Sequence, residues 1–167
     1  MQENAIAIIG VGYVGLPLAL SLAKFHLKVF GYDLDSKRVS ELNSGFDRND
    51  NICNVVPSNL TFTAELLTIR EATTYIITVP TPIDEKRLPD LNPLRQACRD
   101  IAEVISKGDL VIVESTVYPG VTEDICGPLI QEESGLKQGK EFFLGYSPEL
   151  SLIHISEPTR RYAISYA

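Results

Sequence analysis

Short, continuous apolar runs recur along this chain at intervals that suit one repeating architecture. They predict buried strands over residues 5–9, 27–32, 73–79, 110–113 and 142–145. Between them, helical spacing of apolar positions predicts helices over residues 13–25, 36–43, 93–106 and 122–133, and a shorter one over 64–70. Residues 46–60 are polar and irregular, and no element is predicted there.

Two details support the predicted helices. Pro17 falls early in the first helix, where the missing N–H of a proline is tolerated. Thr122 is the expected cap of the last helix, which has acidic residues in its first turn.

This strand–helix alternation predicts an α/β fold, a Rossmann-type doubly wound parallel sheet covered on both faces. The length of 167 residues suits one domain with a real core. In such sheets ligands bind outside the carboxyl ends of the strands, so those ends carry the candidate chemistry.

Composition narrows the range of partners. The net charge of −7 argues against nucleic acid or an anionic membrane as partner, although backbone amides can still bind one anionic ligand. No apolar run reaches the roughly 18 residues of a membrane span, and the first residues lack the features of a signal peptide. Cys53, Cys98 and Cys126 show no metal-binding spacing, which favours no metal and a reducing cytoplasm.

The stretch IIGVGYVGLPLAL carries GxGxxG at Gly10, Gly12 and Gly15, between a predicted strand and a predicted helix. The first glycine permits a tight turn, the second lets a pyrophosphate approach, and the third allows close helix packing. Tyr13 and Val14 lie at the helix start, where free N–H groups would face phosphate. The alternative is a purely structural turn.

Asp33 ends the second predicted strand, 18 positions after Gly15, where an acid that binds ribose is expected. Its carboxylate would accept hydrogen bonds from the ribose hydroxyls and repel a 2′-phosphate, which favours NAD over NADP. The alternative is a solvated strand end. Arg38, one turn into the next helix, is a candidate to cover the adenine, with an exposed helix charge as the alternative.

Three further strand ends carry hydroxyls, prolines and carboxylates: TVPTP at 78–82, ESTVYPG at 114–120 and GYSPE at 145–149. Each alone would pass for an ordinary turn, but all fall at the edge where a cofactor should lie. The residues expected to contact the cofactor here are Thr78, Pro80, Thr81, Ser115 and Thr116.

Five motifs, in their order and spacing, together resemble those of the nucleotide-sugar 6-dehydrogenases. They are GVGYVGLPLA, GYDLD, TVPTPID, ESTVYPG and GYSPE. That family includes UDP-glucose, GDP-mannose and UDP-N-acetylhexosamine dehydrogenases, and the resemblance covers residues 1–149. ESTVYPG and TPIDEKRLPDL are most similar to the UDP-N-acetylhexosamine branch, which makes uronic acids for Vi-antigen and O-antigen type surface polysaccharides.

The resemblance implies oxidation of a sugar primary alcohol to a carboxylate by two hydride transfers to NAD, with a cysteine holding the intermediate. The expected substrate is UDP-N-acetylglucosamine or a related UDP-N-acetylhexosamine, and the expected parent protein is a cytoplasmic homo-oligomer. By the same resemblance, Thr116 positions cofactor and catalytic water, and Glu149 takes part in the acid–base steps beside the sugar.

The last residues depart from the family, in which Arg usually follows SPE. Residues 150–160, LSLIHISEPTR, equal the translation of a common transposase-type sequencing adaptor, and ISYA at 164–167 continues it in frame. We therefore expect an NAD-binding domain over 1–149, incomplete at its C-terminus with a truncated sheet, and a non-native tail over 150–167. His154, Arg160 and Arg161 are then not site residues, and the family's cysteine, lysine and asparagine are expected downstream.

Three alternatives stay open at this point. The parent could act on UDP-glucose or GDP-mannose. It could be a two-electron dehydrogenase of the hydroxyacid or 6-phosphogluconate type, which transfers one hydride per substrate. It could also be a non-catalytic nucleotide-binding module, which is close to what we expect of this chain by itself.

Overall fold

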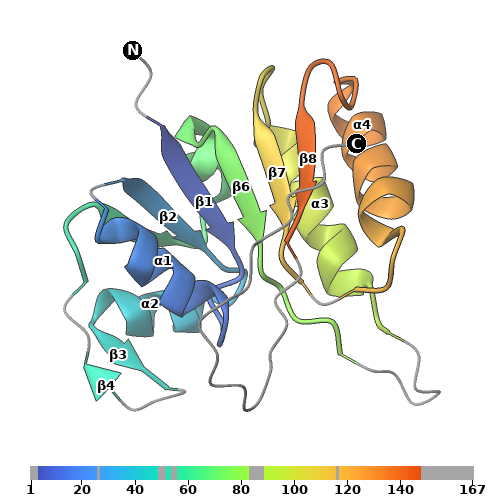
Figure 1. The fold of residues 1–167 in the computed structure, drawn as a ribbon. Coiled ribbons are helices and arrows are strands. Elements are labelled where there is room, and N and C mark those ends of the chain that lie inside the picture. The colour runs from blue at the N-terminus through green and yellow to red at the C-terminus, as the bar shows by residue number, and fades with distance from the viewer. Residues whose placement is uncertain are drawn as a thin grey trace, which may run out of the picture.

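The computed structural model describes residues 4–25, 27–48, 52–53, 56–82, 89–115 and 117–147. Its main sheet has six parallel strands in the order β5-β2-β1-β6-β7-β8 (Figure 1). Counted along the chain this is the order 3-2-1-4-5-6, which is that of a Rossmann fold. The strands are β1 (Ala5–Ile9), β2 (Lys28–Tyr32), β5 (Leu60–Thr63), β6 (Thr74–Ile77), β7 (Leu110–Val113) and β8 (Phe143–Tyr146). The predicted fold class is confirmed.

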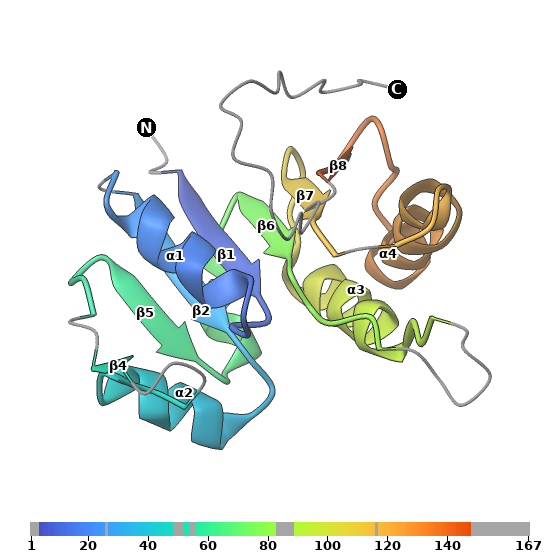
Figure 2. The same ribbon diagram turned by 60° about the horizontal axis from the view of Figure 1, so that its bottom comes forward.

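Continuous apolar runs form these strands because helices cover both faces of the sheet. In β1, Ala7 and Ile9 point into one core and Ile8 into the other, and all three are buried. The helices are α1 (Gly15–Ala23), α2 (Ser36–Asn43), α3 (Asn92–Val104) and α4 (Gly127–Ser134). The pair α1 and α2 packs over one face, and α3 and α4 lie against each other on the opposite face (Figure 2).

The sequence prediction missed one strand of the sheet. β5 pairs with β2 at the edge, from Leu60 opposite Val29 to Thr63 opposite Tyr32. Its four residues, LTFT, are too short and too polar for a buried-strand pattern, and they are placed by pairing with β2. The 46–60 region also contributes a two-residue pair, β3 (Phe46–Asp47) with β4 (Ile52–Cys53).

The prediction that Thr122 caps the last helix is wrong. Thr122 is buried, and no side chain caps this helix start. The segment begins with a π-helical turn, Thr122–Cys126, in which the Gly127 N–H donates to the Thr122 carbonyl. Pro128 follows, and because it has no N–H to donate, the α-helical pattern cannot run through this point.

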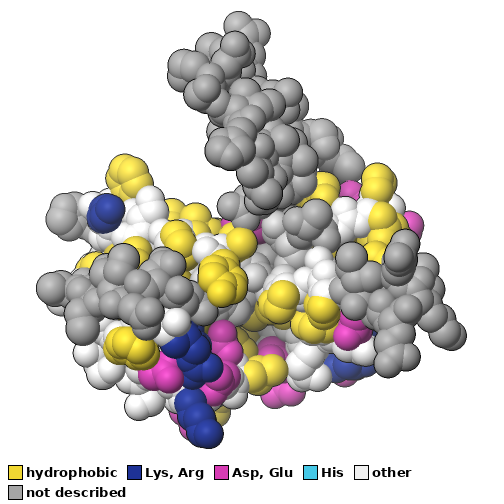
Figure 3. All heavy atoms as spheres, turned by 90° about the horizontal axis from the view of Figure 1, so that it is seen from below, with side chains coloured by type: hydrophobic (Ala, Val, Ile, Leu, Met, Phe, Trp, Pro, Cys, Tyr) yellow, Lys and Arg dark blue, Asp and Glu magenta, His cyan; other side chains and the backbone are white. Residues whose placement is uncertain are grey.

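The remaining predicted elements occur with small shifts at their ends. Residues 64–70 correspond to a 3₁₀ helix, η1 (Leu66–Glu71), and α1 starts two residues later than predicted. In the part of the chain that the structure describes, no helix is long and apolar enough to cross a bilayer. The carboxyl ends of the strands all face the lower edge in Figure 1, and Figure 3 looks directly at that edge.

Candidate dinucleotide-binding site

The three glycines of the first turn are needed for different steric reasons. Gly10 has a φ of 94°, a conformation that favours glycine. A Cβ at Gly15 would lie 1.9 Å from the Gly10 carbonyl oxygen, so only glycine fits there. A Cβ at Gly12 would meet nothing within 4 Å, so this glycine is not required by the protein's own packing. Gly12 therefore leaves open space beside the turn, as the approach of a ligand requires.

Thr78 ties this turn to the end of β6. Its hydroxyl lies 2.7 Å from the Gly10 carbonyl oxygen and 3.1 Å from that of Ile9, and the side chain is buried. We predicted Thr78 as a cofactor contact. Its hydroxyl donates to the protein backbone, so Thr78 stabilises the conformation of the glycine turn.

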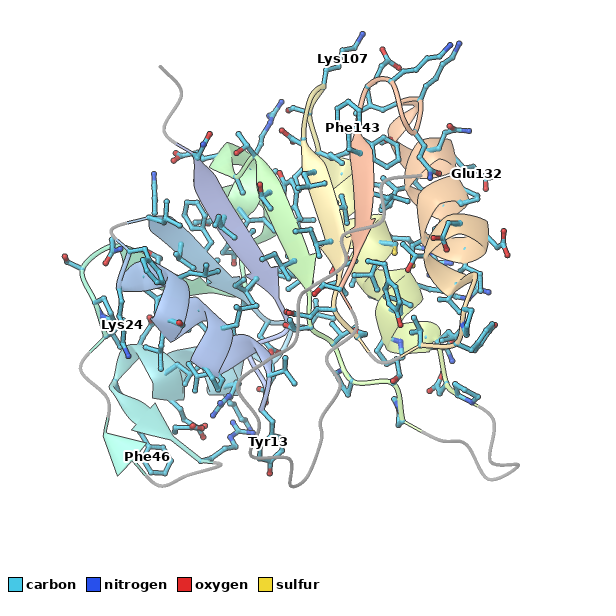
Figure 4. The ribbon with its side chains drawn as sticks, in the orientation of Figure 1. Tyr13, Lys24, Phe46, Lys107, Glu132 and Phe143 are labelled. Atoms are coloured by element: carbon cyan, nitrogen blue, oxygen red, sulfur yellow. The ribbon has the colours of Figure 1, made fainter. Side chains whose placement is uncertain are left out.

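Helix α1 begins directly after the turn without a side-chain cap. The Leu16 N–H already donates to the Gly12 carbonyl at 3.2 Å and Pro17 has no N–H, so the N–H groups that can face a ligand are those of the residues before Leu16. The helix dipole adds partial positive charge there. Tyr13 is 78% exposed and points away from the body of the protein at this edge (Figure 4). Val14 is the residue that precedes the helix. An uncapped helix start beside the open space at Gly12 suits a pyrophosphate.

Asp33 directly follows β2, as predicted, and it lies next to the glycine turn. One carboxylate oxygen accepts from the Val11 N–H at 3.0 Å, and the other accepts from the Asp35 N–H at 2.9 Å. A carboxylate has about four acceptor positions, so each oxygen can still accept one more hydrogen bond. Two adjacent hydroxyl groups of a ribose match this remaining capacity.

Arg38 is buried, so the alternative of an exposed helix charge is wrong, whereas a contact of Arg38 with the adenine stays a prediction. Its guanidinium is buried below the turn, where Nε donates to the Val11 carbonyl at 3.1 Å and Nη1 to the Asp47 carboxylate at 2.6 Å. Its Nη2 has no hydrogen-bond partner among the described residues. Burial follows from the position of Arg38 on the inner face of α2 beside Val39 and Leu42.

A pocket of about 190 Å³ opens between the ends of β2 and β6 and the start of α3. It is lined by Ile9, Gly10, Tyr32, Asp33, Leu34, Val79, Pro80, Pro93, Gln96, Ala97 and Asp100. Most of these side chains are apolar, and hydrophobic groups gather in the middle of this edge with charged groups beside them (Figure 3). The volume is below the roughly 300–1,000 Å³ of complete ligand pockets, so it suits one part of a larger ligand.

Of the other residues predicted to contact the cofactor, only some lie at the pocket. Pro80 lines the pocket, and Thr81 lies just beyond it and is half-buried. The Ser115 hydroxyl donates to the Val79 carbonyl at 2.7 Å, which joins the ends of β6 and β7. Thr116 and Glu149, the two predicted catalytic residues, lie outside the described residues.

Two cysteines can be excluded from this edge. Cys98 and Cys126 are fully buried in the core between the sheet and α3 and α4. A hydrogen bond to Cys126 and burial raise the pKa of the Cys98 thiol. A neutral, buried thiol is a poor nucleophile. Within the described ranges, no cluster of acidic, His or Cys side chains could hold a metal ion.

These features fit NAD in three places. The uncapped helix and the open space at Gly12 fit the pyrophosphate, Asp33 fits the ribose, and the apolar pocket next to Asp33 fits a flat base.

Comparison with known proteins agrees with this geometry. A family model described as the UDP-glucose/GDP-mannose dehydrogenase family, NAD binding domain, matches residues 4–153. This chain belongs to that family. The part present is the NAD-binding domain, so the predicted cofactor is confirmed at the level of the family.

The individual relatives are nucleotide-sugar dehydrogenases. The chain is 45% identical over 152 residues to a UDP-N-acetyl-D-glucosamine 6-dehydrogenase of Pseudomonas aeruginosa, which covers 89% of this chain and 36% of that protein. Among solved structures, a UDP-D-ManNAc dehydrogenase from Pyrococcus horikoshii has a TM-score of 0.78 at 34% identity, covering 87% of this chain and 36% of that one. A GDP-mannose dehydrogenase from Pseudomonas aeruginosa has a TM-score of 0.75 at 29% identity, and the match covers 89% of this chain and 36% of that one. The chain thus spans about a third of the length of these relatives.

Sequence reasoning missed the polar groups behind the site. Asp47 partners Arg38 from the short β3 strand, and Asp100 and Gln96 reach the pocket from α3. A signal for Asp100 was available, because a carboxylate at this position interrupts the apolar face of α3, which is otherwise formed by residues such as Ala97 and Ile101.

Proposed function

We propose that this chain binds NAD at the carboxyl edge of its sheet. Gly12 and the start of α1 hold the pyrophosphate, and Asp33 holds the adenosine ribose. The hydrogen bond from the Val11 N–H to Asp33 carries this proposal, because it fixes the ribose-binding carboxylate against the phosphate-binding turn. NAD supplies the hydride acceptor, and the residues of this chain bind and orient it.

Charge explains why NAD is favoured over NADP. A 2′-phosphate would face the carboxylate of Asp33. The two described arginines nearby are already held by acids, Arg38 by Asp47 and Arg48 by Asp35 and Glu41. Arg38 is also buried and Arg48 is shared between two carboxylates, so neither is a free positive charge that would offset the repulsion between Asp33 and an extra phosphate.

For the longer protein that the relatives represent, we propose oxidation of a UDP-N-acetylhexosamine at its primary alcohol to a carboxylate, in two hydride transfers. The 45% identity to a UDP-N-acetyl-D-glucosamine 6-dehydrogenase supports this substrate class. In this proposal Thr116 positions cofactor and water, and Glu149 moves a proton beside the sugar. The protein would be a cytoplasmic homo-oligomer that supplies a uronic acid for surface polysaccharide.

The chain by itself should bind NAD without oxidising a sugar, because the two cysteines whose side chains the structure describes, Cys98 and Cys126, are buried in the core. We also propose that residues 150–167 are translated adaptor and contribute nothing to binding. A variant that ends at Glu149 should then bind NAD with unchanged affinity. Weaker binding by the shortened chain would contradict this part of the proposal.

The central test is a titration of this chain with NADH, followed by NADH fluorescence. The chain has no tryptophan, so protein emission interferes little. We expect saturable binding, with NAD competing at least about tenfold better than NADP, the effect of one charged contact. The Gly12→Ala variant is the matched control, because it should keep the fold and lose binding. A folded chain that does not bind NADH would refute the proposal.

Activity requires the longer protein. It should release two NADH per UDP-N-acetylglucosamine consumed. One NADH per substrate would instead support the two-electron type of dehydrogenase.

A further inference from the structure

Three polar side chains form a hydrogen-bonded chain in the largely apolar pocket. The Tyr32 hydroxyl, at the end of β2, donates to one oxygen of Asp100 at 3.3 Å. Gln96, one helical turn before Asp100 on α3, donates its amide Nε2 to the other oxygen at 2.8 Å. Asp100 is only 6% exposed, and all three residues line the pocket. Burying a carboxylate is costly unless it is hydrogen-bonded, and the two bonds from Tyr32 and Gln96 offset that cost for Asp100.

The carboxylate fixes which way the Gln96 amide faces. Asp100 can only accept hydrogen bonds, so Gln96 must turn its NH₂ group toward it. The Gln96 carbonyl oxygen is then left as an acceptor. Burial, followed by the charge of Asp100, raises the pKa of Tyr32, so the phenol stays neutral and acts as a donor to Asp100. The polar groups of the pocket therefore offer the Gln96 carbonyl oxygen as an acceptor, and the one donor left on these three side chains is the second N–H of the Gln96 amide.

The pocket adjoins Asp33, which holds the ribose in the proposed function, so the ring joined to that ribose would enter it. Its walls include Ile9, Val79 and Ala97, which suit a flat apolar ring. Adenine carries an exocyclic NH₂ donor at the sixth ring position, whereas hypoxanthine carries a carbonyl oxygen there. An acceptor at the pocket matches the first and repels the second.

We propose that Gln96, oriented by Asp100, accepts a hydrogen bond from the exocyclic amine of adenine and so sets the base specificity of this site. The inference rests on the proposed function, because it takes the ligand to be NAD. In it Gln96 contacts the base, and Asp100 is a positioning residue that acts through Gln96.

The test compares binding of NAD with that of nicotinamide hypoxanthine dinucleotide, which differs only in the base. The unmodified chain should prefer NAD by roughly tenfold or more, the effect of one well-placed hydrogen bond against a repulsive contact. In Gln96→Met this preference should fall to within about threefold, since the acceptor is gone. Gln96 is exposed, so this variant should fold normally. The matched control is Arg99→Met, on an exposed position of the same helix outside the pocket, which should keep the full preference.

Asp100→Asn gives a second, independent measurement. An asparagine can offer either its oxygen or its NH₂, so Gln96 would be free to turn, and the preference for adenine should drop as in Gln96→Met. A role confined to anchoring α3 would lower thermal stability in this variant without changing the ratio of the two affinities.

The outcomes separate the two proposals. If the folded chain binds neither dinucleotide, the proposed function fails and this inference fails with it. If it binds both equally well, or if Gln96→Met keeps the full preference, NAD binding stands and the role of Gln96 is refuted.

Discussion

The two halves of the carboxyl edge are built differently. In the adenosine half, at the ends of β1, β2 and β6, hydrogen bonds join residues far apart in the chain, as between Thr78 and Gly10 or Asp33 and Val11. In the far half, at the ends of β7 and β8, Ser115 bonds to Val79 and the Tyr146 hydroxyl donates to the Val117 carbonyl at 3.2 Å, but Tyr146 remains 41% exposed. The adenosine half is therefore shaped before a ligand arrives, and pre-organisation of this kind favours binding.

This difference indicates which part of the function the chain carries by itself. Binding of the adenosine and pyrophosphate needs only groups that are already held in place. In the proposed function, the chemistry depends on Thr116 and Glu149 and on a cysteine from elsewhere in the longer protein. Four predictions probe this contrast, starting with the largest expected effect.

The buried ion pair under the adenosine half should matter most. Asp47→Asn leaves the Arg38 guanidinium buried without its counter-charge, and breaking such a pair costs about 3–5 kcal/mol. Urea denaturation followed by circular dichroism measures the loss. The control is Glu71→Gln, which breaks the exposed Lys28–Glu71 pair and should change little. Equal effects of the two variants would show that burial of the Arg38 pair is not decisive.

A methyl group on Gly15 should disrupt the turn itself. In Gly15→Ala the new Cβ would overlap the Gly10 carbonyl oxygen, so the backbone must move, at a cost of about 3 kcal/mol. NADH binding should be lost together with stability. Gly12→Ala should lose binding alone, because its Cβ meets no protein atom. If Gly12→Ala lowered stability as much as Gly15→Ala, the assignment of open space to the ligand would be wrong.

Removing one hydroxyl group from each half compares the effect of the two halves on ligand binding. Thr78→Val and Ser115→Ala each remove one buried hydrogen bond, to Gly10 and Val79 respectively, and each should cost about 1 kcal/mol of stability. Only Thr78→Val should weaken binding of ADP-ribose, which reaches the adenosine half alone. Calorimetric titration with ADP-ribose distinguishes them, and an equal loss in both variants would erase the contrast between the halves.

The smallest expected effect is on the stability of the fold at low pH. The Arg38 N–H, followed by that of Lys37 and the charge of Arg48, lowers the pKa of Asp35 at the start of α2. Because the folded pKa is lower than the unfolded one, the ionised carboxylate stabilises the fold above the ordinary Asp pKa. That contribution is lost as pH falls through the lower folded value. Asp35→Asn, which caps without titrating, should flatten this part of the stability profile between about pH 5 and 2. If the stability of Asp35→Asn changed with pH as steeply as that of the unmodified chain, Asp35 would not contribute to the pH dependence.

The sequence by itself determined the elements whose signal is local. Apolar runs such as 5–9 became central strands because helices bury both faces, and GxGxxG became the turn at Gly10 because only glycine suits its backbone. Asp33 was found because its place is set by the end of a strand. These features depend on residues close in the chain, so the pattern was enough to predict them.

Tertiary structure decided what depends on distant partners. The sequence left Arg38 as either an adenine contact or an exposed charge, and only the fold buries it beside Asp47. β5 became a strand only by pairing with β2. The contact between Tyr32 and Asp100 joins residues 68 positions apart, across the strand order that the fold creates. Spacing along the chain carries no information on such contacts, because they form only when the sheet brings β2 and α3 to the same pocket.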